Sequence, residues 1–234
     1  MDLPPDSRRP LSPLEGGPHD IEFFFDPGCP FAWQTSVWIR RVAALRDVRI
    51  GWRFISLKFV NEGNDLPEGM VEAQDRGFAY HRVCAAARAE LGNDAVGDLY
   101  KAWGERYWYR RGDGELVHRL AASADHIDLA EILADLDLPA RLADAATDPS
   151  WDQVIRAETD EAFRRTGPDV GTPIITYDPP TGNSLFGPVI SEVPEDDQTA
   201  LAFYDALRTF ADFRGFSELK RTHRAPLDLP LLAS

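Results

Sequence analysis

The stretch Ile21–Trp33 constrains the fold more than any other part of the chain. Ile21–Phe25 is a short, almost wholly apolar run, which is typical of a buried central strand. Asp26-Pro27-Gly28 interrupts it, because proline fixes φ and glycine adopts conformations that other residues avoid. A predicted helix follows over Pro30–Arg46, and proline is favoured at its first position because the missing N–H would have no partner there. The sequence thus predicts a strand, a tight turn and a helix that begins at Cys29.

The position of Cys29 indicates a reactive thiol. The start of a helix carries unpaired N–H groups and the positive end of the helix dipole. Both favour the thiolate over the thiol, so we expect a lowered pKa and a nucleophilic cysteine. The alternative is a buried cysteine that acts as a small apolar side chain, but such residues usually lie inside a helix or a strand.

The rest of the chain alternates strands with a long helical region. Val48–Ile55 predicts a second strand, so the chain opens as β-α-β with a right-handed crossover. From about Leu66 to Gly167 the apolar spacing is helical. Predicted buried positions on two of these helices, at spacings of three and four, are Tyr80, Cys84, Ala87 and Leu91, and Leu99, Trp103 and Tyr107.

The final third predicts a hairpin and a helix. Pro173–Tyr177 and Ser184–Ile190 are two strand-like runs, separated by a loop rich in Pro, Gly, Asn and Asp. Gly187-Pro188 is expected to form a bulge or to end the second strand. A last helix over residues 195–213 is expected to bury Phe203, Leu207 and Phe210.

The motif around Cys29 resembles that of a known family. Cys29-Pro30-Phe31-Ala32 is similar to the C-P-x-C site of DsbA-like thioredoxin-fold oxidoreductases. The longer pattern Asp26–Trp38 most resembles the actinobacterial mycothiol-dependent nitroreductase group, with Ala32 in place of the second, resolving cysteine. The resemblance continues through Gly171-Thr172-Pro173, Phe186–Val189 and Phe216–Arg221, and so covers nearly the whole chain after the first 18 or so residues.

The resemblance implies an α/β protein with a thioredoxin-like fold and a large all-helical insertion between β-α-β and β-β-α halves. The corresponding division is a flexible leader over 1–18, a thioredoxin-like domain over 19–62 and 168–215, an insertion over 63–167 and a C-terminal tail over 216–234.

The resemblance also implies the mechanism. Cys29 would be the catalytic residue, and Thr172-Pro173 would contain the cis-proline beside it, although most X-Pro bonds are trans. Since Ala32 supplies no second sulfur, an external thiol has to release Cys29 from a mixed disulfide. Mycothiol, or another low-molecular-weight thiol, is the implied co-substrate, with no tightly bound cofactor. Pro30, Phe31, Ala32, Thr172 and Pro173 would shape the site.

Four further residues are candidates for substrate binding: Trp33, Asn61, His81 and Trp108. Asn61 matches an asparagine of the family pattern and follows the second strand. His81 is the histidine best placed for the cleft, whereas most lone histidines are surface or core residues. Tyr107–Arg111 forms a possible pocket lining, but such aromatic residues are often core. Cys84 is expected in the core, and His118 and His126 are weaker candidates still. No spacing of His, Cys or Asp resembles a metal site.

Composition limits the partners and the compartment. The 234 residues carry a formal net charge of −14, which argues against a face that binds nucleic acid. The chain contains no apolar run of about 18 residues, and its N-terminus lacks the apolar core of a signal peptide, so we expect a cytoplasmic protein that does not bind membranes. We expect a monomer or a homodimer that acts on a small thiol and a small disulfide or electrophilic substrate.

Three functions remain open. The first is a cytoplasmic thiol-disulfide oxidoreductase that reduces disulfides or nitro-type electrophiles. The second is an enzyme like the kappa-type glutathione transferases or hydroxychromene-carboxylate isomerases, which commonly carry serine at the position of Cys29. The third is a thioredoxin-fold binding module without redox activity.

Overall fold

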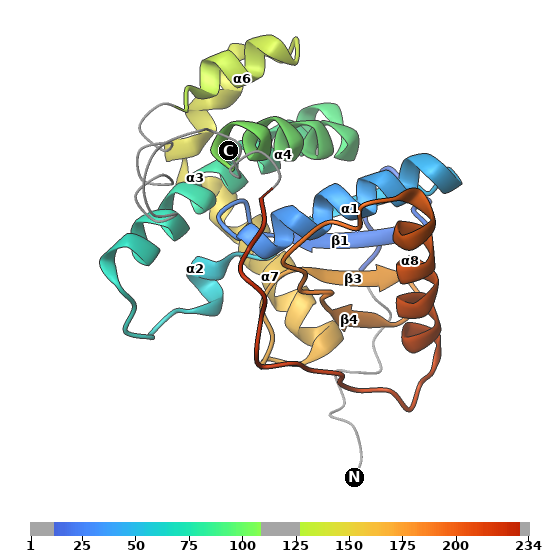
Figure 1. Cartoon of the computed structure of the whole chain (residues 1–234). Coiled ribbons are helices and arrows are strands. Elements are labelled where there is room, and N and C mark those ends of the chain that lie inside the picture. The colour runs from blue at the N-terminus through green and yellow to red at the C-terminus, as the bar shows by residue number, and fades with distance from the viewer. Residues whose placement is uncertain (1–11, 109–126, 230–234) are drawn as a thin grey trace.

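The computed structural model describes residues 12–108 and 127–229, and it combines one small sheet with many helices (Figure 1). The strands are β1 (Ile21–Phe25), β2 (Ile50–Phe54), β3 (Ile174–Tyr177) and β4 (Ser184–Phe186). The α-helices are α1 (Pro30–Arg46), α2 (Leu57–Val60), α3 (Glu68–Leu91), α4 (Asn93–Tyr107), α6 (Leu129–Asp135), α7 (Asp152–Thr166) and α8 (Asp197–Asp212). Two 3₁₀ helices, η2 (Ala140–Thr147) and η3 (Pro149–Trp151), precede α7.

The sheet has the strand order β2-β1-β3-β4. β1 and β2 are parallel, with Phe23 opposite Trp52, and α1 connects them. β3 runs antiparallel to β1, and β4 runs antiparallel to β3. This β-α-β unit followed by a β-β-α unit is a thioredoxin-like fold, with the helices from α2 to α7 inserted between the two halves. The predicted fold class is confirmed.

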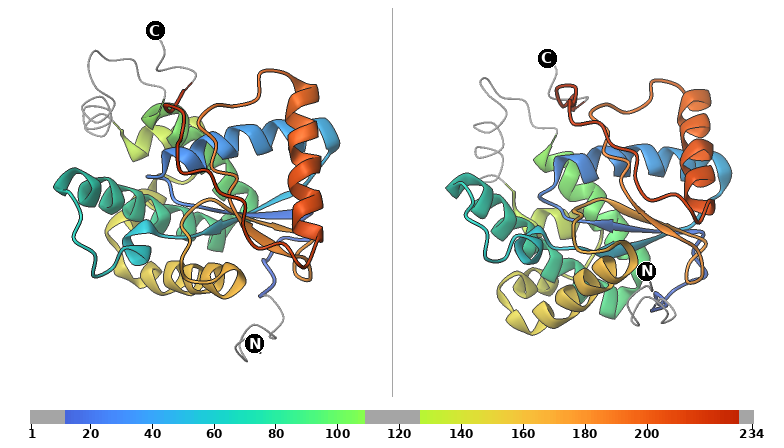
Figure 2. Two further views of the ribbon diagram at one scale, coloured as in Figure 1. Left: turned by 60° about the horizontal axis from the view of Figure 1, so that its bottom comes forward. Right: turned by 90° about the horizontal axis from the view of Figure 1, so that it is seen from below.

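The two faces of β1 contact different layers. Ile21, Phe23 and Phe25 belong to the large apolar core, whereas Phe24 belongs to a small separate cluster with Ala162 of α7. Figure 2 shows α1 and α8 on one side of the sheet and α7 on the other. Because successive side chains of a strand point to opposite faces, the almost wholly apolar sequence of β1 follows from this double cover.

A buried ionic cluster ties α7 to the sheet. The carboxylate of Glu22, only 2% exposed, accepts hydrogen bonds from Arg53 Nε at 2.6 Å and from an Arg165 Nη at 2.7 Å. Glu158 of α7 accepts from Arg53 at 3.2 Å and from the backbone N–H of Phe54 at 2.8 Å. Glu161 pairs with Arg165 at 2.7 Å. The charge of Glu22 is therefore matched inside the apolar run of β1.

Helix α1 has the predicted bounds and packs against both the sheet and α8. Trp38, fully buried, donates from its indole N–H to the carbonyl of Ala200 in α8 at 3.1 Å. The predicted buried face of α8 is partly wrong. Its most buried residues are Ala200, Tyr204 and Ala211, while Phe203 and Leu207 are half-buried and Phe210 is 37% exposed. The reason is that α8 places Tyr204 near Trp38 and Tyr177, and Phe210 stacks on Phe216 outside the core.

Among the described residues, the region between β2 and β3 contains helices and no strand, as predicted. Tyr80, Cys84 and Ala87 of α3 are buried, but Leu91 is 43% exposed because it is the last residue of the helix. The predicted stripe of α4 is buried throughout. Gly104 of α4 makes room for the α1 residue Trp33, since a Cβ at Gly104 would lie 2.1 Å from the indole ring.

Both ends of the described chain contact the body. Of the predicted flexible leader, residues 1–11 lie outside the described residues. Ser12 donates to Glu161 at 3.2 Å and accepts from Arg53, so the chain is anchored from Ser12 onward.

β4 ends at Phe186, earlier than predicted, because Gly187 has a φ of +98°. No helix in the described ranges is both long enough and apolar enough to cross a bilayer.

Candidate functional site

Cys29 is the N-cap residue of α1, as predicted. Its backbone N–H donates to the carbonyl of Asp26 at 3.0 Å, which closes the turn between β1 and α1. Its sulfur accepts the N–H of Ala32 at 3.5 Å. The thiol in turn lies 3.7 Å from the carbonyl oxygen of Thr172, to which it donates. The Thr172-Pro173 bond is cis, as the family resemblance implied. The structure therefore brings Cys29 and the start of β3 together across 143 residues of sequence.

Asp26, the first residue of the family pattern, is a fully buried carboxylate beside this turn. One oxygen accepts the N–H of Gly28 at 2.7 Å and the other accepts the N–H of Leu57 at 2.7 Å. Asp26 thus joins the loop that carries Cys29 to the loop after β2. Burial raises the pKa of Asp26 to about 6, although the two N–H groups act in the opposite direction.

The expectation of a lowered pKa for Cys29 is wrong for this conformation. Cys29 is only 7% exposed. Burial raises the pKa of Cys29 to about 12, and the negative charge of Asp26 acts in the same direction. The N–H groups of Ala32 and Phe31 and the positive charge of Arg224 lower the pKa but are outweighed. Helix α1 begins at the predicted residue. The loss of water around the buried sulfur nevertheless changes the pKa of Cys29 more than the helix start does.

The pKa of Asp26 gives a pH-dependent prediction. Since the folded-state value of about 6 lies above the ordinary 3.8, ionisation favours the unfolded chain. The stability that neutral Asp26 contributes is complete below about pH 4 and is lost as the pH rises through about 6. We therefore expect the wild type to lose roughly 2 kcal/mol relative to Asp26→Asn between pH 4 and pH 7. Urea unfolding at both pH values measures this difference.

The control is Asp75→Asn, which removes a half-exposed carboxylate on α3 that pairs with Lys58. We expect this variant to follow the wild type across the same pH range to within about 1 kcal/mol. A stability difference between wild type and Asp26→Asn that stays constant from pH 4 to pH 7 contradicts the raised pKa of the buried Asp26.

The residues after Cys29 have different surroundings. Pro30 and Phe31 are half-buried, and Ala32 is fully buried beneath the sulfur. Trp33 is 1% exposed and meets Tyr100 edge to face, with ring centres 5.6 Å apart. Trp33 is thus buried in this structure, and its role as a substrate-binding residue stays a prediction.

Two other binding candidates also lie in the core. His81 is fully buried, with Nε2 3.0 Å from the carbonyl oxygen of Phe25 and its ring beside Phe25 and Phe54. Burial lowers the pKa of His81 to about 3, so this imidazole is neutral. Trp108 is 1% exposed and packs edge to face on Tyr107. Both side chains are buried in this structure, and their roles in substrate binding stay predictions.

Asn61 stays a prediction. It ends α2, is half-buried, and donates from its side chain to the carbonyl of Leu57 at 3.0 Å. Asn61 thus lies one helical turn from Leu57, whose N–H donates to Asp26 in the loop that carries Cys29. The weaker candidates Tyr109, Arg110, Arg111, His118 and His126 lie outside the described residues.

The second cysteine belongs to the core. Cys84 is fully buried in α3, and burial raises its pKa well above the ordinary range. Neither cysteine forms a disulfide. Within residues 12–108 and 127–229, no three side chains of His, Cys, Asp or Glu gather as a metal ion would require.

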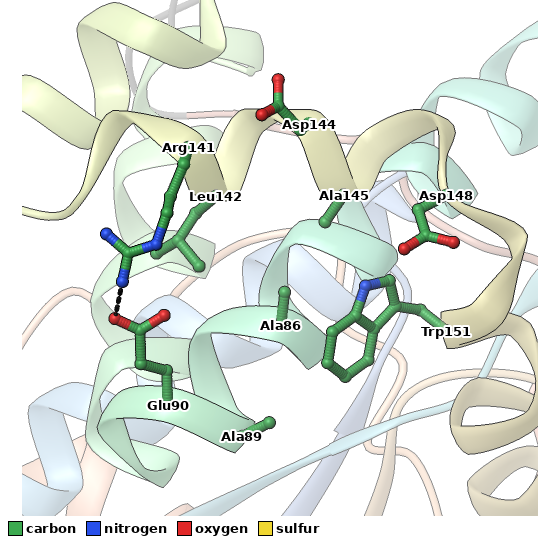
Figure 3. A pocket seen from close by; sticks show the side chains of 9 residues that line it. All are labelled: Ala86, Ala89, Glu90, Arg141, Leu142, Asp144, Ala145, Asp148 and Trp151. Carbon is green, nitrogen blue, oxygen red and sulfur yellow. Dashed lines mark hydrogen bonds and ion pairs between the residues drawn. The ribbon is translucent and has the colours of Figure 1, made fainter.

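A shallow open groove lies elsewhere, between α3 and η2 (Figure 3). An ion pair between Arg141 and Glu90 spans one end of it, and Trp151 forms the other side. None of the candidate site residues lines this groove, so it is separate from the cysteine site.

Sequence reasoning missed Asp26, Gln34 and Arg224. Asp26 was visible in the motif, but nothing in the sequence shows that a carboxylate in a turn is fully buried. Gln34 and Arg224 gain their positions only through the C-terminal segment, which packs on α1 (Figure 1). For Gln34, the one available signal in the sequence is a polar residue on the side of the predicted helix that faces the core.

A thioredoxin-like fold with a cysteine at the start of α1, next to a cis-proline, is the arrangement of the thioredoxin-fold oxidoreductases. The chain belongs to the Rv2466c-like family, described as mycothiol-dependent nitroreductase Rv2466c, whose model matches residues 28–221. The chain is also 32% identical over 215 residues to the uncharacterized protein Rv2286c of Mycobacterium tuberculosis, a match that covers 91% of this chain and 86% of the relative.

Solved structures similar to this chain include two thiol-disulfide proteins. One is the cytosolic disulfide reductase DsbM from Pseudomonas aeruginosa, with 15% identity, a TM-score of 0.48, and coverage of 81% of this chain and 98% of that one. The other is the thiol-disulfide exchange protein alpha-DsbA2 from Wolbachia pipientis, with 16% identity, a TM-score of 0.42, and coverage of 85% and 86%.

Proposed function

We propose that this protein is a cytoplasmic oxidoreductase that uses Cys29 as its single nucleophile and mycothiol, or a similar small thiol, as its reductant. One observation carries the proposal: the Cys29 sulfur caps α1 and lies 3.7 Å from the carbonyl of Thr172, while Ala32 occupies the place of a resolving cysteine. The only other cysteine of the chain, Cys84, is enclosed in the core. Membership of a family described as mycothiol-dependent supports the choice of thiol.

The proposed cycle has two exchange steps. The Cys29 thiol loses its proton to solvent, and the thiolate attacks one sulfur of a disulfide R–S–S–R′. A Cys29–S–S–R bond forms, the old S–S bond breaks, and R′S⁻ leaves with its electron pair. A mycothiol thiolate then attacks the R sulfur, which releases Cys29 and yields a disulfide between R and mycothiol. A nitro substrate would instead take two electrons and two protons from the Cys29 and mycothiol thiols, leaving water, a nitroso product and the mixed disulfide.

The surroundings of Cys29 assign roles in this cycle. The N–H groups at the start of α1 would stabilise the departing Cys29 thiolate, and the Thr172 carbonyl and Pro173 would position the incoming sulfur. Pro30, Phe31 and Ala32 shape the same site, and Asn61 is a candidate binding residue. Because Cys29 is 7% exposed, a substrate sulfur reaches it only when neighbouring groups move aside.

The proposed domain division keeps the insertion at 63–167 and the tail at 216–234.

Steady-state kinetics test this function. The substrate is the mixed disulfide of mycothiol and cysteine, the reductant is reduced mycothiol, and the cysteine released is quantified by chromatography. We expect ping-pong kinetics, activity at background for Cys29→Ser, and activity within about twofold of wild type for the core control Cys84→Ala. Full turnover by Cys29→Ser contradicts the proposal and favours the hypothesis of a kappa-type transferase or an isomerase.

The burial of Cys29 favours one second candidate, a thioredoxin-fold module that binds small thiols without exchanging disulfides. A thiol with a pKa of about 12 is almost wholly protonated near neutral pH, and the thiolate is the reactive form. In the kinetic assay this module shows no turnover by the wild type, while calorimetry detects mycothiol binding. Turnover that depends on Cys29 excludes it.

A further inference from the structure

The C-terminal segment lies across the helix that carries Cys29. Residues 213–229 run from the end of α8 back to the start of α1 (Figures 1 and 2). The N–H of Asp228 donates to the carbonyl of Ser191 at 2.7 Å, and the Ser191 hydroxyl donates to the carbonyl of Ala225 at 3.0 Å. The buried side chain of Gln34, on α1, donates to the carbonyls of Ser191 and Asp228. Leu229 is buried at the end of this segment.

These bonds hold Arg224 beside the active-site loop. The Arg224 guanidinium carbon lies 5.1 Å from the centre of the Phe31 ring, and Phe31 is two residues from Cys29. The side chain is exposed, and it contacts the ring while its N–H groups remain open to a ligand. Its charge also reaches the sulfur, since Arg224 lowers the pKa of Cys29, although burial has the larger and opposite effect.

Arg224 differs from most arginines of this acidic protein. Arg41, Arg46 and Arg82 each pair with a carboxylate, as do nine other arginines of the described residues. In the described part of the chain, no carboxylate lies within ion-pair distance of Arg224. A chain with a net charge of −14 repels anions over most of its surface. The guanidinium of Arg224 is therefore a local positive charge near Cys29 on a protein whose overall potential is negative.

We propose that Arg224 binds a negatively charged oxygen group of the electrophile and thereby selects aromatic or conjugated substrates that carry a carboxylate near the reacting atom. Guanidinium and carboxylate form two parallel hydrogen bonds, and the half-buried Phe31 ring offers an apolar surface beside them. This inference rests on the proposed function, because it concerns the substrate of the same cysteine. The carboxylate stays on Arg224 while the Cys29 thiolate attacks the neighbouring disulfide sulfur and the other thiolate leaves.

Two aromatic disulfides test the proposal. The dianionic 5,5′-dithiobis(2-nitrobenzoate) carries a carboxylate on each ring, and 4,4′-dithiodipyridine is uncharged near neutral pH. We expect Arg224→Ala to slow the reaction of Cys29 with the dianionic probe about tenfold, the scale of one partly screened charge pair. We expect a change of less than about twofold with the neutral probe, whose rate also reports that the variant is folded around Cys29.

Two further variants sharpen the result. Arg214→Ala removes the same charge at an exposed residue just after α8, and we expect both rates to stay within about twofold of wild type. Arg224→Lys keeps the charge without the paired hydrogen bonds, so we expect partial recovery with the dianionic probe. Equal slowing of both probes by Arg224→Ala, or no change with either, overturns the proposal. A wild type that reacts with neither probe refutes the proposed function itself.

Discussion

Replacing Ala32 with cysteine is expected to convert the site from dependence on an external thiol to self-release. In the proposed cycle of the wild type, a mixed disulfide on Cys29 persists until a small thiol attacks it. Ala32 is buried one helical turn from Cys29, and its N–H contacts the Cys29 sulfur at 3.5 Å. A sulfur at this position attacks within the molecule, and well-oriented intramolecular reactions have effective molarities of about 10⁵ M or more.

The measurement starts from protein that carries one mycothiol on Cys29, with excess reagent removed. We expect the wild-type adduct to keep its mass in the absence of free thiol, whereas the Ala32→Cys adduct loses mycothiol and gains an internal disulfide. Ala32→Ser, which has the same shape without the thiol, is the control and retains its adduct. Spontaneous loss of mycothiol from wild type and Ala32→Ser contradicts the single-thiol mechanism.

The second large effect concerns the ionic cluster under β1. Glu22→Gln removes one negative charge from between two nearly buried arginines. Among the described residues, Arg53 then keeps an ion pair with Glu158, and Arg165 keeps one with Glu161. Breaking a buried ion pair costs about 3–5 kcal/mol, because the partner charge stays in a poorly solvated place. We expect the free energy of unfolding to fall by about 3 kcal/mol, measured by urea denaturation at pH 7.

The matched control for this cluster is Glu62→Gln. Glu62 pairs with Arg156 at 3.1 Å, but the two side chains are 66% and 45% exposed. Exposed pairs contribute about 0–1 kcal/mol, so we expect little change. If Glu22→Gln and Glu62→Gln lower the free energy of unfolding by similar amounts, burial is not the reason that the Glu22 cluster stabilises the packing of α7 on the sheet.

The local part of the fold was readable from the sequence. Pro30 and Gly28 fix the break between β1 and α1 through their own backbone preferences, so the bounds Ile21–Phe25 and Pro30–Arg46 followed from neighbouring residues. The thioredoxin-like topology required the family resemblance, because apolar periodicity does not tell an insertion from a separate domain. Leu91 and Phe210 were misplaced since their spacing fits a buried face, while the ends of their helices lie at the surface.

The site depended on segments far away in the sequence. The prediction for the Cys29 pKa considered only the helix that the residue begins, whereas the sulfur is buried and contacts the distant Thr172 carbonyl. Trp33, His81 and Trp108 looked like binding residues because aromatic rings serve both cores and ligand sites. The sequence does not show that all three side chains are buried in the structure. Glu22 likewise gave no sign that its partners are Arg53 and Arg165, the latter 143 residues away.

The central claim is tested most directly by the intact mass of the protein after incubation with oxidised mycothiol, followed by peptide mapping. The account predicts one mycothiol per chain, bonded to Cys29 and removed by reduced mycothiol, with Cys84 unmodified. An unchanged mass, a mycothiol on Cys84, or an internal bond between Cys29 and Cys84 would contradict it.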